Sequence, residues 1–533
     1  MPATILATHY RIASTERAAH TVPSLSAPPM LSTRGQRALI RPPLLKCSLF
    51  ENQFADSNPR GYINLGVAEN SLCVEWLIDY FEKHFSLHYS DFTYGTSLSG
   101  SNRLFAALRN LFGEYFHALR PVERDHIITG TGASTVIDLL VSNIADEHEG
   151  ILVARPFYNG FQTSFEGRNG VKAVGVELRE GTEAKPEALE AFEQELARSE
   201  ARGTKIRAIM LCNPHNPLGF CYPRETLLAY ATFCEKWNLH LIVDEIYALS
   251  TFETKHAAVP FTSILSIDPL AEAHCNPSRI HVVYSASKDW GVNGLRLGVL
   301  VSQSNPELHT AMESSCLLMK ISSASDVLWS SLLLDPVALP TYVAMNRARL
   351  AAAYQSAAAF LDRWRIPYRP SSAGHFVFCD LTRFLPERAY EDGRHLESGV
   401  EREEELAKVF LRHGINVARG AAYSYPVPGF FRLTFTLRPD YFAIGLARFE
   451  RALGLVATVI EDSDATSSSS SSYLSSSSSS HSSSSSSSRV DMKQVHLSCS
   501  ISDIDQATTE LALGGCVGET RCGQEGTAVL MSC

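Results

Sequence analysis

The stretch Leu239-His-Leu-Ile-Val-Asp-Glu-Ile-Tyr247 carries most of the information about the fold. Its first five residues are mostly apolar, which is typical of a buried strand, and they follow a helical pattern over Arg224–Trp237. A strand that follows a helix in this way indicates a mainly parallel sheet covered by helices. Asp244 and Tyr247 come directly after the strand, at the edge where parallel sheets bind ligands. The stretch therefore predicts an α/β protein with a polar site at this edge.

The alternation of strand and helix continues on both sides of this stretch. A further helix and five further apolar strands are predicted at Ala133–Asn143 and at His126–Thr129, Ile151–Ala154, Ile206–Leu211, Ile280–Tyr284 and Leu297–Val301. After the helical region Tyr342–Trp364 the pattern changes to an acidic helix between strands, at Glu401–Arg412 and at His375–Asp380, Ile415–Ala418 and Phe431–Leu437. This change predicts a second, smaller α+β domain, completed by the segment near Ile63–Val67.

These patterns divide the chain into five parts. The large domain is predicted over residues 91–340 and the small domain over residues 341–460, with residues 31–90 contributing to the small domain. Residues 1–30 are rich in Ser, Thr, Pro and Ala, and we interpret them as a disordered arm, the alternative being a mitochondrial presequence. The chain is almost pure serine from Ser463 to Ser488, so a disordered tail is predicted over residues 461–533.

The composition indicates a small-molecule substrate. The 533 residues are 45% hydrophobic, which is enough for a large core. The 47 Lys and Arg residues against 57 Asp and Glu residues give a formal net charge of −10, which argues against nucleic acid or a membrane as a partner. The twelve cysteines contain no C-x-x-C pair, so they are predicted to be reduced core thiols, without a metal site. We expect a cytoplasmic protein.

Polar and glycine-rich segments follow several predicted strands. Gly130-Thr-Gly-Ala-Ser134 is a turn that opens a helix, where backbone N–H groups and the helix dipole suit a phosphate, although such a turn is often plain architecture. In Ser285-Ala-Ser-Lys288 the lysine follows an apolar strand, a setting that lowers the pKa of an amine. A second cation, Arg296, comes eight residues later, and Asn213-Pro-His-Asn-Pro-Leu-Gly219 forms a double Asn-Pro turn.

A phosphate cradle, a strand-end aspartate, a lysine, a second cation and an Asn/Tyr pair are the groups that bind pyridoxal 5′-phosphate (PLP). Asp244-Glu-Ile-Tyr247, the Asn213–Gly219 turn and Ser285-Ala-Ser-Lys288 with Arg296 resemble the class I/II aminotransferase family. The resemblance covers nearly all of residues 31–454 and keeps the motifs in the family's order. It implies a PLP-dependent enzyme of fold type I, with a mainly parallel sheet between helices and a smaller α+β domain.

Two segments resemble the 1-aminocyclopropane-1-carboxylate synthase branch of this family. Ile63-Asn-Leu-Gly-Val-Ala-Glu-Asn-Ser71 contains the branch's G-x-A-E-N pattern, and Ser285-Ala-Ser-Lys-Asp289 contains its S-x-S-K-D pattern. The chain departs from the branch at Gly291-Val-Asn-Gly-Leu-Arg296, which lacks a proline before the second glycine, and at Tyr94-Gly-Thr-Ser97, where the branch has Tyr-x-Gly. These differences leave the substrate open.

The resemblance implies roles around the cofactor ring. Lys288 would hold the cofactor covalently and then move the proton at the substrate Cα. Asp244 would form an ion pair with the protonated ring nitrogen. Tyr247 and Asn216 would bond to the ring oxygen, and Tyr158 would stack on the ring face.

The resemblance also implies a phosphate site and a second subunit. The phosphate would bind the turn, two serines and the arginine, namely Gly132, Ala133, Ser134, Ser285, Ser287 and Arg296. Tyr94 matches the family's tyrosine that reaches the phosphate of the partner subunit. A homodimer with active sites at the subunit interface follows from that match.

Two residues are candidates for binding the substrate. Arg432 interrupts an apolar strand; it could simply face solvent, but the family places an arginine there that clamps the α-carboxylate. Glu69 could simply cap the following helix, while in the synthase branch this glutamate lies at the substrate site, where an anion suits a sulfonium or an amine.

Several functions are compatible with these residues. The first is elimination with C–S bond cleavage on S-adenosylmethionine or a related sulfur-bearing amino acid. The alternative is transamination of an amino acid to a 2-oxo acid, and fungal-type relatives add a specialised lyase or aminotransferase of secondary metabolism. A regulator that binds PLP without turnover belongs to another class, and the lysine argues against it.

Overall fold

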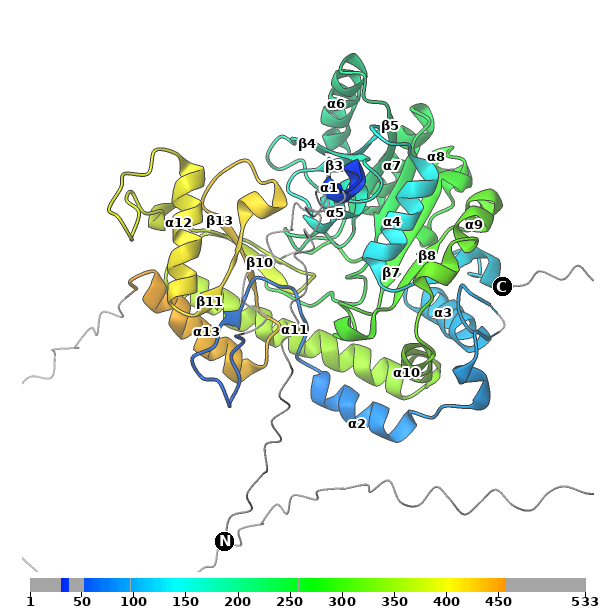
Figure 1. Cartoon of the computed structure of the whole chain (residues 1–533), viewed down its shortest axis with the longest axis horizontal. Helices are drawn as coiled ribbons and strands as arrows, with labels where there is room; N and C mark the ends of the chain where they lie inside the picture. The colour runs from blue at the N-terminus through cyan, green and yellow to red at the C-terminus, as the bar shows by residue number, and fades with distance from the viewer. Residues whose placement is uncertain (1–29, 38–51, 96, 257, 456–533) are drawn as a thin grey trace, which may run out of the picture. The chain divides into compact units, whose positions relative to one another are not determined.

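The computed structural model describes residues 30–37 and 52–455, except residues 96 and 257 (Figure 1). Every described residue belongs to one compact unit of the chain. Residues 1–29 of the arm predicted over residues 1–30, and all of the tail predicted over residues 461–533, lie outside the described residues. The presequence alternative therefore also stays a prediction.

The large sheet has seven strands in the order β2-β8-β7-β6-β5-β3-β4. All neighbours pair in parallel except β8, which is antiparallel to both β2 and β7. The strands are β2 (Ile127–Gly130), β3 (Gly150–Ala154), β4 (Lys172–Val176), β5 (Ile206–Cys212), β6 (His240–Asp244), β7 (Ile280–Ser285) and β8 (Gly298–Val301). The prediction of a mainly parallel α/β sheet is confirmed.

Alternate residues of these strands enter two separate hydrophobic cores. In β6, Leu241 and Val243 join one core and Ile242 joins the other, because successive side chains of a strand point to opposite faces. Helix α4 (Ala133–Ile144) packs on the second core with α5 (Gly160–Glu166). Burial on both faces explains why these strands have continuous apolar sequences.

Strand β4 was not predicted from the sequence. Its five residues contain a lysine and a glycine, and only Val176 is fully buried. The strand lies at the edge of the sheet, where one neighbour and partial burial suffice, so it lacks the apolar run by which the other strands were recognised.

The second sheet is antiparallel and has the strand order β12-β13-β10-β9. Its strands are β9 (Tyr368–Arg369), β10 (Phe376–Asp380), β12 (Ala418–Arg419) and β13 (Phe430–Thr434). The single strand expected over Ile415–Ala418 is divided: β11 (Ile415–Asn416) pairs in parallel with β1 (Ile63–Asn64), and β12 pairs with β13. The N-terminal segment is thereby attached beside this sheet.

The remaining helices surround the two sheets, and α11 contacts α10 as well as β10 (Figure 1). They are α1 (Thr33–Arg37), α2 (Val74–His84), α3 (Asn102–Glu114), α6 (Leu189–Ala201), α7 (Arg224–Lys236), α8 (Pro269–Ala273), α9 (Pro306–Glu313), α10 (Ser323–Leu334), α11 (Ala338–Arg363), α12 (Gly399–Arg412) and α13 (Pro439–Ala452). Within the described ranges no single helix is long and apolar enough to cross a membrane; α10 and α11 meet that criterion only together, and they are bent by 89°.

The seven cysteines of the described part are free and buried, as predicted for core thiols: Cys73, Cys212, Cys221, Cys234, Cys275, Cys316 and Cys379.

A close approach of two glycines fixes the start of α4 against the sheet. A Cβ on Gly298 of β8 would lie 2.3 Å from the backbone carbon of Gly132. We expect Gly298→Ala to destabilise the protein by ~1–3 kcal/mol, because backbone atoms have to move to admit the methyl group. Denaturant unfolding measures this change.

Gly113→Ala is the matched control. Gly113 lies in α3 with nothing within 4 Å of an added Cβ, so the same substitution there is expected to stabilise by up to ~1 kcal/mol. Equal stability of the two variants would contradict the close approach.

Candidate active site

A cavity of about 640 Å³ opens at the carboxyl ends of β5 and β6, and residues of both sheets line it. Ten of the predicted site residues line this cavity: Ala133, Ser134, Tyr158, Asn216, Asp244, Tyr247, Ser287, Lys288, Arg296 and Arg432. They come from segments more than 290 residues apart in the sequence, from Ala133 to Arg432. The edge of the sheet therefore brings together residues that the sequence placed after separate strands.

Lys288 lies three residues after β7 and reaches across the cavity to the N-terminal segment. Its Nζ donates a hydrogen bond of 2.6 Å to the backbone carbonyl of Ala68. Removal from water lowers the pKa of Lys288 to about 8, the charges of Arg432 and Arg296 lower it too, and the carboxylates of Glu69 and Asp244 raise it. About a tenth of this amine is therefore neutral, and nucleophilic, at pH 7, far more than for a lysine in water.

Asp244 is the last residue of β6 and is 4% exposed. Its carboxylate accepts a hydrogen bond of 3.2 Å from the backbone N–H of Ile246, and it forms no salt bridge within the described part of the chain. Burial raises its pKa to about 7, while the Ile246 N–H and the charge of Lys288 lower it. A buried carboxylate so poorly compensated fits a bound cationic group.

The start of α4 forms an anion site together with Arg296. Gly132, with φ of 101°, precedes the first turn, and no side chain caps the helix there. Arg296 donates to the carbonyls of Thr131 at 3.2 Å and Asn293 at 2.8 Å, and its guanidinium occupies the space that a Cβ on Gly132 would need. Uncapped N–H groups, a helix dipole and a guanidinium in one place fit a phosphate.

Arg432 is 4% exposed and is held on several sides. It donates to Asn216 Oδ1 at 2.9 Å and to the carbonyl of Gly66 at 2.6 Å. Its guanidinium carbon lies 4.6 Å from the ring centre of Phe376 and 4.8 Å from that of Tyr423. This arginine does not face solvent; two rings and two hydrogen bonds fix a cation inside the cavity.

Four predicted site residues do not line the cavity: Glu69, Tyr94, Gly132 and Ser285. Gly132 lies just before the lining residues of α4, and Ser285 is fully buried, with its Oγ donating to Leu297 at 2.6 Å. The phosphate contact of Ser285 stays a prediction. Glu69 is exposed, although its charge still acts on Lys288.

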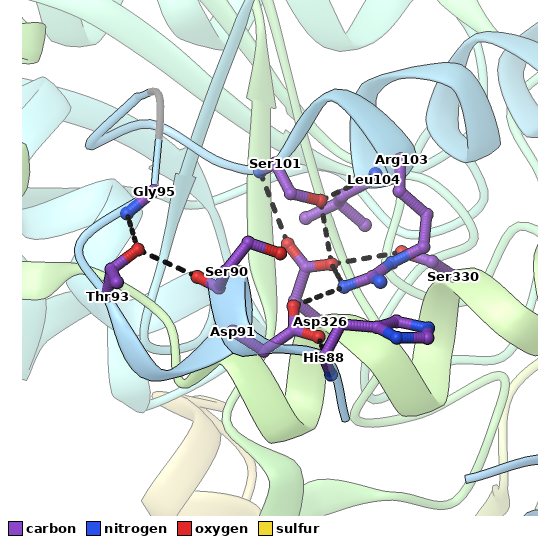
Figure 2. Close-up of polar contacts among 10 residues, drawn as sticks. All are labelled: His88, Ser90, Asp91, Thr93, Gly95, Ser101, Arg103, Leu104, Asp326 and Ser330. Carbon is purple, nitrogen blue, oxygen red and sulfur yellow. Dashed lines mark hydrogen bonds and ion pairs between the residues drawn. The ribbon is translucent and has the colours of Figure 1, made fainter. Parts of the chain in front are cut away.

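Tyr94 is 74% exposed, and its neighbour Thr93 bonds to the Ser90 carbonyl at 2.8 Å and to the Gly95 N–H at 3.2 Å (Figure 2). Arg103 bridges Asp91 at 3.3 Å and Asp326 at 3.0 Å, and Asp91 also accepts from the backbone N–H of His88 at 2.8 Å. These bonds fix the backbone of residues 88–95, and the aromatic side chains of Tyr89, Phe92 and Tyr94 are exposed.

Sequence reasoning missed part of the cavity wall. Tyr423, Ala68 and Cys212 line it, as do residues of α12, including Glu404, Ala407 and Lys408. No motif marks Tyr423 or the α12 residues, because they reach the cavity only through the packing of the second sheet. Cys212 comes directly after the predicted strand Ile206–Leu211, and that position was the available signal; in the structure it is the last residue of β5 and pairs with Asp244.

The sequence profile of the aminotransferase class I and II family matches residues 77–449, so the chain belongs to that family. The probable aminotransferase gliI of Aspergillus fumigatus is 33% identical over 404 residues, covering 74% of this chain and 89% of the relative. The human 1-aminocyclopropane-1-carboxylate synthase-like protein 1 is 29% identical, covering 76% and 79%. A Thermus thermophilus aspartate aminotransferase structure superposes with a TM-score of 0.61 at 20% identity, covering 80% of this chain and all of its own.

These comparisons confirm the predicted family, its resemblance to both groups of relatives and the fold type I architecture. The chain is an enzyme of this family, and its cofactor is PLP. The residues present fit that cofactor: the uncompensated Asp244 suits its ring nitrogen, the uncapped α4 and Arg296 suit its phosphate, and Lys288 supplies the amine. When bound, PLP accepts the electron pair released at the substrate Cα.

The pH dependence of cofactor uptake tests the assignment of Lys288. Only the neutral amine reacts, so the rate of covalent uptake by cofactor-free protein should rise about tenfold per pH unit and level off above the Lys288 pKa of about 8. Borohydride trapping at each pH, followed by peptide mapping, measures this rate.

Lys320 is the control residue, because burial lowers its pKa as well but it does not line the cavity. Label found on Lys320, or on any lysine other than Lys288, would contradict the assignment.

Proposed function

We propose that this enzyme cleaves a C–S bond in a sulfur-bearing α-amino acid, S-adenosylmethionine or a related compound. The observation that carries the proposal is the character of the cavity beyond Lys288. The wall formed there by α12 and the following segments is largely small and apolar: Ala407, Leu411, Val417, Ala418, Ala421 and Ala422. Such a wall suits an extended thioether or sulfonium side chain.

The cations at this end of the cavity are already paired with glutamates. Arg419 Nη1 lies 3.7 Å from Glu404 Oε2, and Lys408 Nζ lies 3.4 Å from Glu405 Oε2. Among the described lining residues, Arg432 is then the cation placed for the α-carboxylate, while Arg296 faces the phosphate end. A second carboxylate on the substrate would lack a partner, which argues against dicarboxylic amino acids.

The chain's own residues would act in a defined order. Arg432 binds and orients the α-carboxylate through its planar fork. Lys288, with its lowered pKa, takes the proton from Cα and holds it as an ammonium, for which the Ala68 carbonyl is an acceptor. The negative charge of Glu69, which acts on this amine, favours a cationic group near the rim of the cavity.

Transamination is the second candidate. The relatives that share 32–34% identity with this chain are named probable aminotransferases, gliI, aclI and sirI among them, while those named synthase-like share 29%. The exposed side chain of Glu69 also permits a reaction in which this carboxylate has no part.

A product analysis separates the two reactions. Purified protein is mixed with S-adenosylmethionine, then with sulfur-bearing amino acids and aspartate, each with and without a 2-oxo acid. Without any 2-oxo acid we expect methylthioadenosine from S-adenosylmethionine, or pyruvate, ammonia and a released thiol from a cysteine-type thioether, and no reaction of aspartate. New amino acids formed only with a 2-oxo acid would establish transamination instead.

Glu69→Gln then tests the contribution of the charge. It removes the charge and keeps the shape, so it should lower kcat/KM for the sulfur substrate at least about tenfold, or ~1.4 kcal/mol, without loss of bound cofactor. Glu75→Gln changes another exposed carboxylate of the same region, on α2, and should have no effect. Unchanged kinetics of Glu69→Gln would favour transamination.

We also propose a homodimer in which Tyr94 reaches the partner's phosphate site. The proposal is supported by three exposed aromatic side chains on a segment fixed by ion pairs, an arrangement typical of an interface rather than of free surface. Tyr94 does not line the cavity around Lys288 of its own chain.

Hybrid dimers test this arrangement. Chains with Tyr94→Ala or Lys288→Ala are each expected to be impaired, but mixed dimers would contain one site with an intact Lys288 and an intact Tyr94. We expect unfolding and refolding of an equal mixture to restore about a quarter of the wild-type activity. No recovery would show that Tyr94 acts within its own chain or not at all.

A further inference from the structure

Tyr423 lines the cavity beside Arg432, and the roles implied by the sequence motifs do not include it. It is the last residue of the short helix η11 (Gly420–Tyr423), and it is 3% exposed. Its ring centre lies 4.8 Å from the guanidinium carbon of Arg432. The ring therefore packs against the cation that is proposed to bind the substrate carboxylate.

The hydroxyl of Tyr423 has no hydrogen-bond partner among the described residues. It is also not one of the fully enclosed polar atoms without a partner, to which Arg432 Nε belongs. Because the rest of the side chain is buried and the residue lines the cavity, the hydroxyl meets open space there. A hydroxyl that opens into a cavity is available to a ligand.

This hydroxyl is a hydrogen-bond donor at neutral pH. Burial raises the pKa of Tyr423 to about 12, although the charge of Arg432 lowers it. The phenol therefore keeps its proton, and no described carboxylate or carbonyl accepts it. The acceptor must then be water or a ligand. An anionic ligand accepts such a bond more strongly than water does.

Arg432 marks the place where such an anion binds. Of its five N–H groups, one on Nη1 donates to Asn216 and one on Nη2 donates to the carbonyl of Gly66, while Nε has no partner. The nearby cations Lys408 and Arg419 are paired with glutamates. A carboxylate that uses the remaining N–H groups of Arg432 would lie beside the Tyr423 ring and its hydroxyl.

Two contacts hold the backbone that carries Tyr423. Its carbonyl accepts a hydrogen bond of 2.9 Å from the N–H of Phe157, which follows β3 of the large sheet. The carboxylate of Glu403, which is 1% exposed on α12, accepts from the N–H groups of Ala421 at 3.1 Å and Gly429 at 2.8 Å. The hydroxyl is therefore presented from a fixed segment.

We propose that Tyr423 is a substrate-binding residue, whose hydroxyl donates a hydrogen bond to the carboxylate that Arg432 anchors. A carboxylate bound by two side chains has less freedom to turn, so the hydroxyl also restricts the orientation of the substrate Cα. This inference rests on the proposed role of Arg432, and it holds whichever bond of the substrate is broken. No covalent bond changes, and the proton stays on the phenol.

The test measures the binding of a simple carboxylate to the PLP-loaded enzyme by isothermal titration calorimetry. Hexanoate carries its carboxylate on a chain that suits the apolar wall, and hexan-1-ol has the same chain without the charge. Both lack an amino group, so Kd reports contacts without a reaction. Tyr423→Phe removes the hydroxyl and keeps the ring. Tyr425→Phe is the matched control, because it removes a hydroxyl of the same segment outside the cavity lining.

We expect Tyr423→Phe to bind hexanoate at least about tenfold more weakly, because the carboxylate loses a donor, and to bind hexan-1-ol as the wild type does. Tyr425→Phe should bind both ligands with wild-type affinity. The denaturant midpoint of Tyr423→Phe should equal that of the wild type, since the hydroxyl has no partner in the protein. Unchanged hexanoate binding, equal weakening of acid and alcohol, or loss of the fold would each overturn the proposal.

Arg432→Lys separates this inference from the role on which it rests. The lysine lacks the planar fork, so hexanoate binding should weaken in this variant too. If Arg432→Lys binds hexanoate as the wild type does, the proposed anchor is wrong, and the inference fails with it. If Arg432→Lys weakens binding and Tyr423→Phe does not, the anchor stands and only the role of the hydroxyl is refuted.

Discussion

Arg432 is the constraint on which the active site depends, because it joins three parts of the chain at one point. From β13 in the small sheet it donates to Asn216, which follows β5 of the large sheet, and to Gly66, which follows β1. A buried guanidinium requires such partners, so the small sheet cannot move away from the large one without leaving a charge unpaired. Arg432, the proposed anchor of the substrate carboxylate, therefore also holds the two sheets together.

Burial produces the chemistry of the residues around this point. The same removal from water lowers the pKa of Lys288 to about 8 and raises that of Asp244 to about 7. Lys288 therefore carries less positive charge, and Asp244 less negative charge, than each would in water. The neutral amine suits an amine-reactive ligand, and the carboxylate suits a cationic one. The cavity is therefore prepared for an amine-reactive cofactor with a cationic ring, and PLP is such a cofactor.

The proposed substrate end of the cavity is formed by a different set of residues. Its wall comes mainly from α12 and the segment after it, and its cations, Lys408 and Arg419, are paired with glutamates of the same helix. Family membership fixes the chemistry at Cα, whereas this wall selects the side chain. Relatives with different names can therefore share the cofactor residues and differ here.

The sequence by itself determined the parallel sheet, the family and ten predicted site residues that line one cavity, because buried strands such as Leu239–Val243 have continuous apolar runs and the motifs follow them directly. It did not reveal the edge strand β4, the division of Ile415–Ala418 between two sheets, or the exposure of Glu69 and Tyr94. Only the tertiary structure placed Tyr423 and the α12 residues in the wall of the cavity. Such contacts join residues far apart in the chain, and no local periodicity or spacing encodes them.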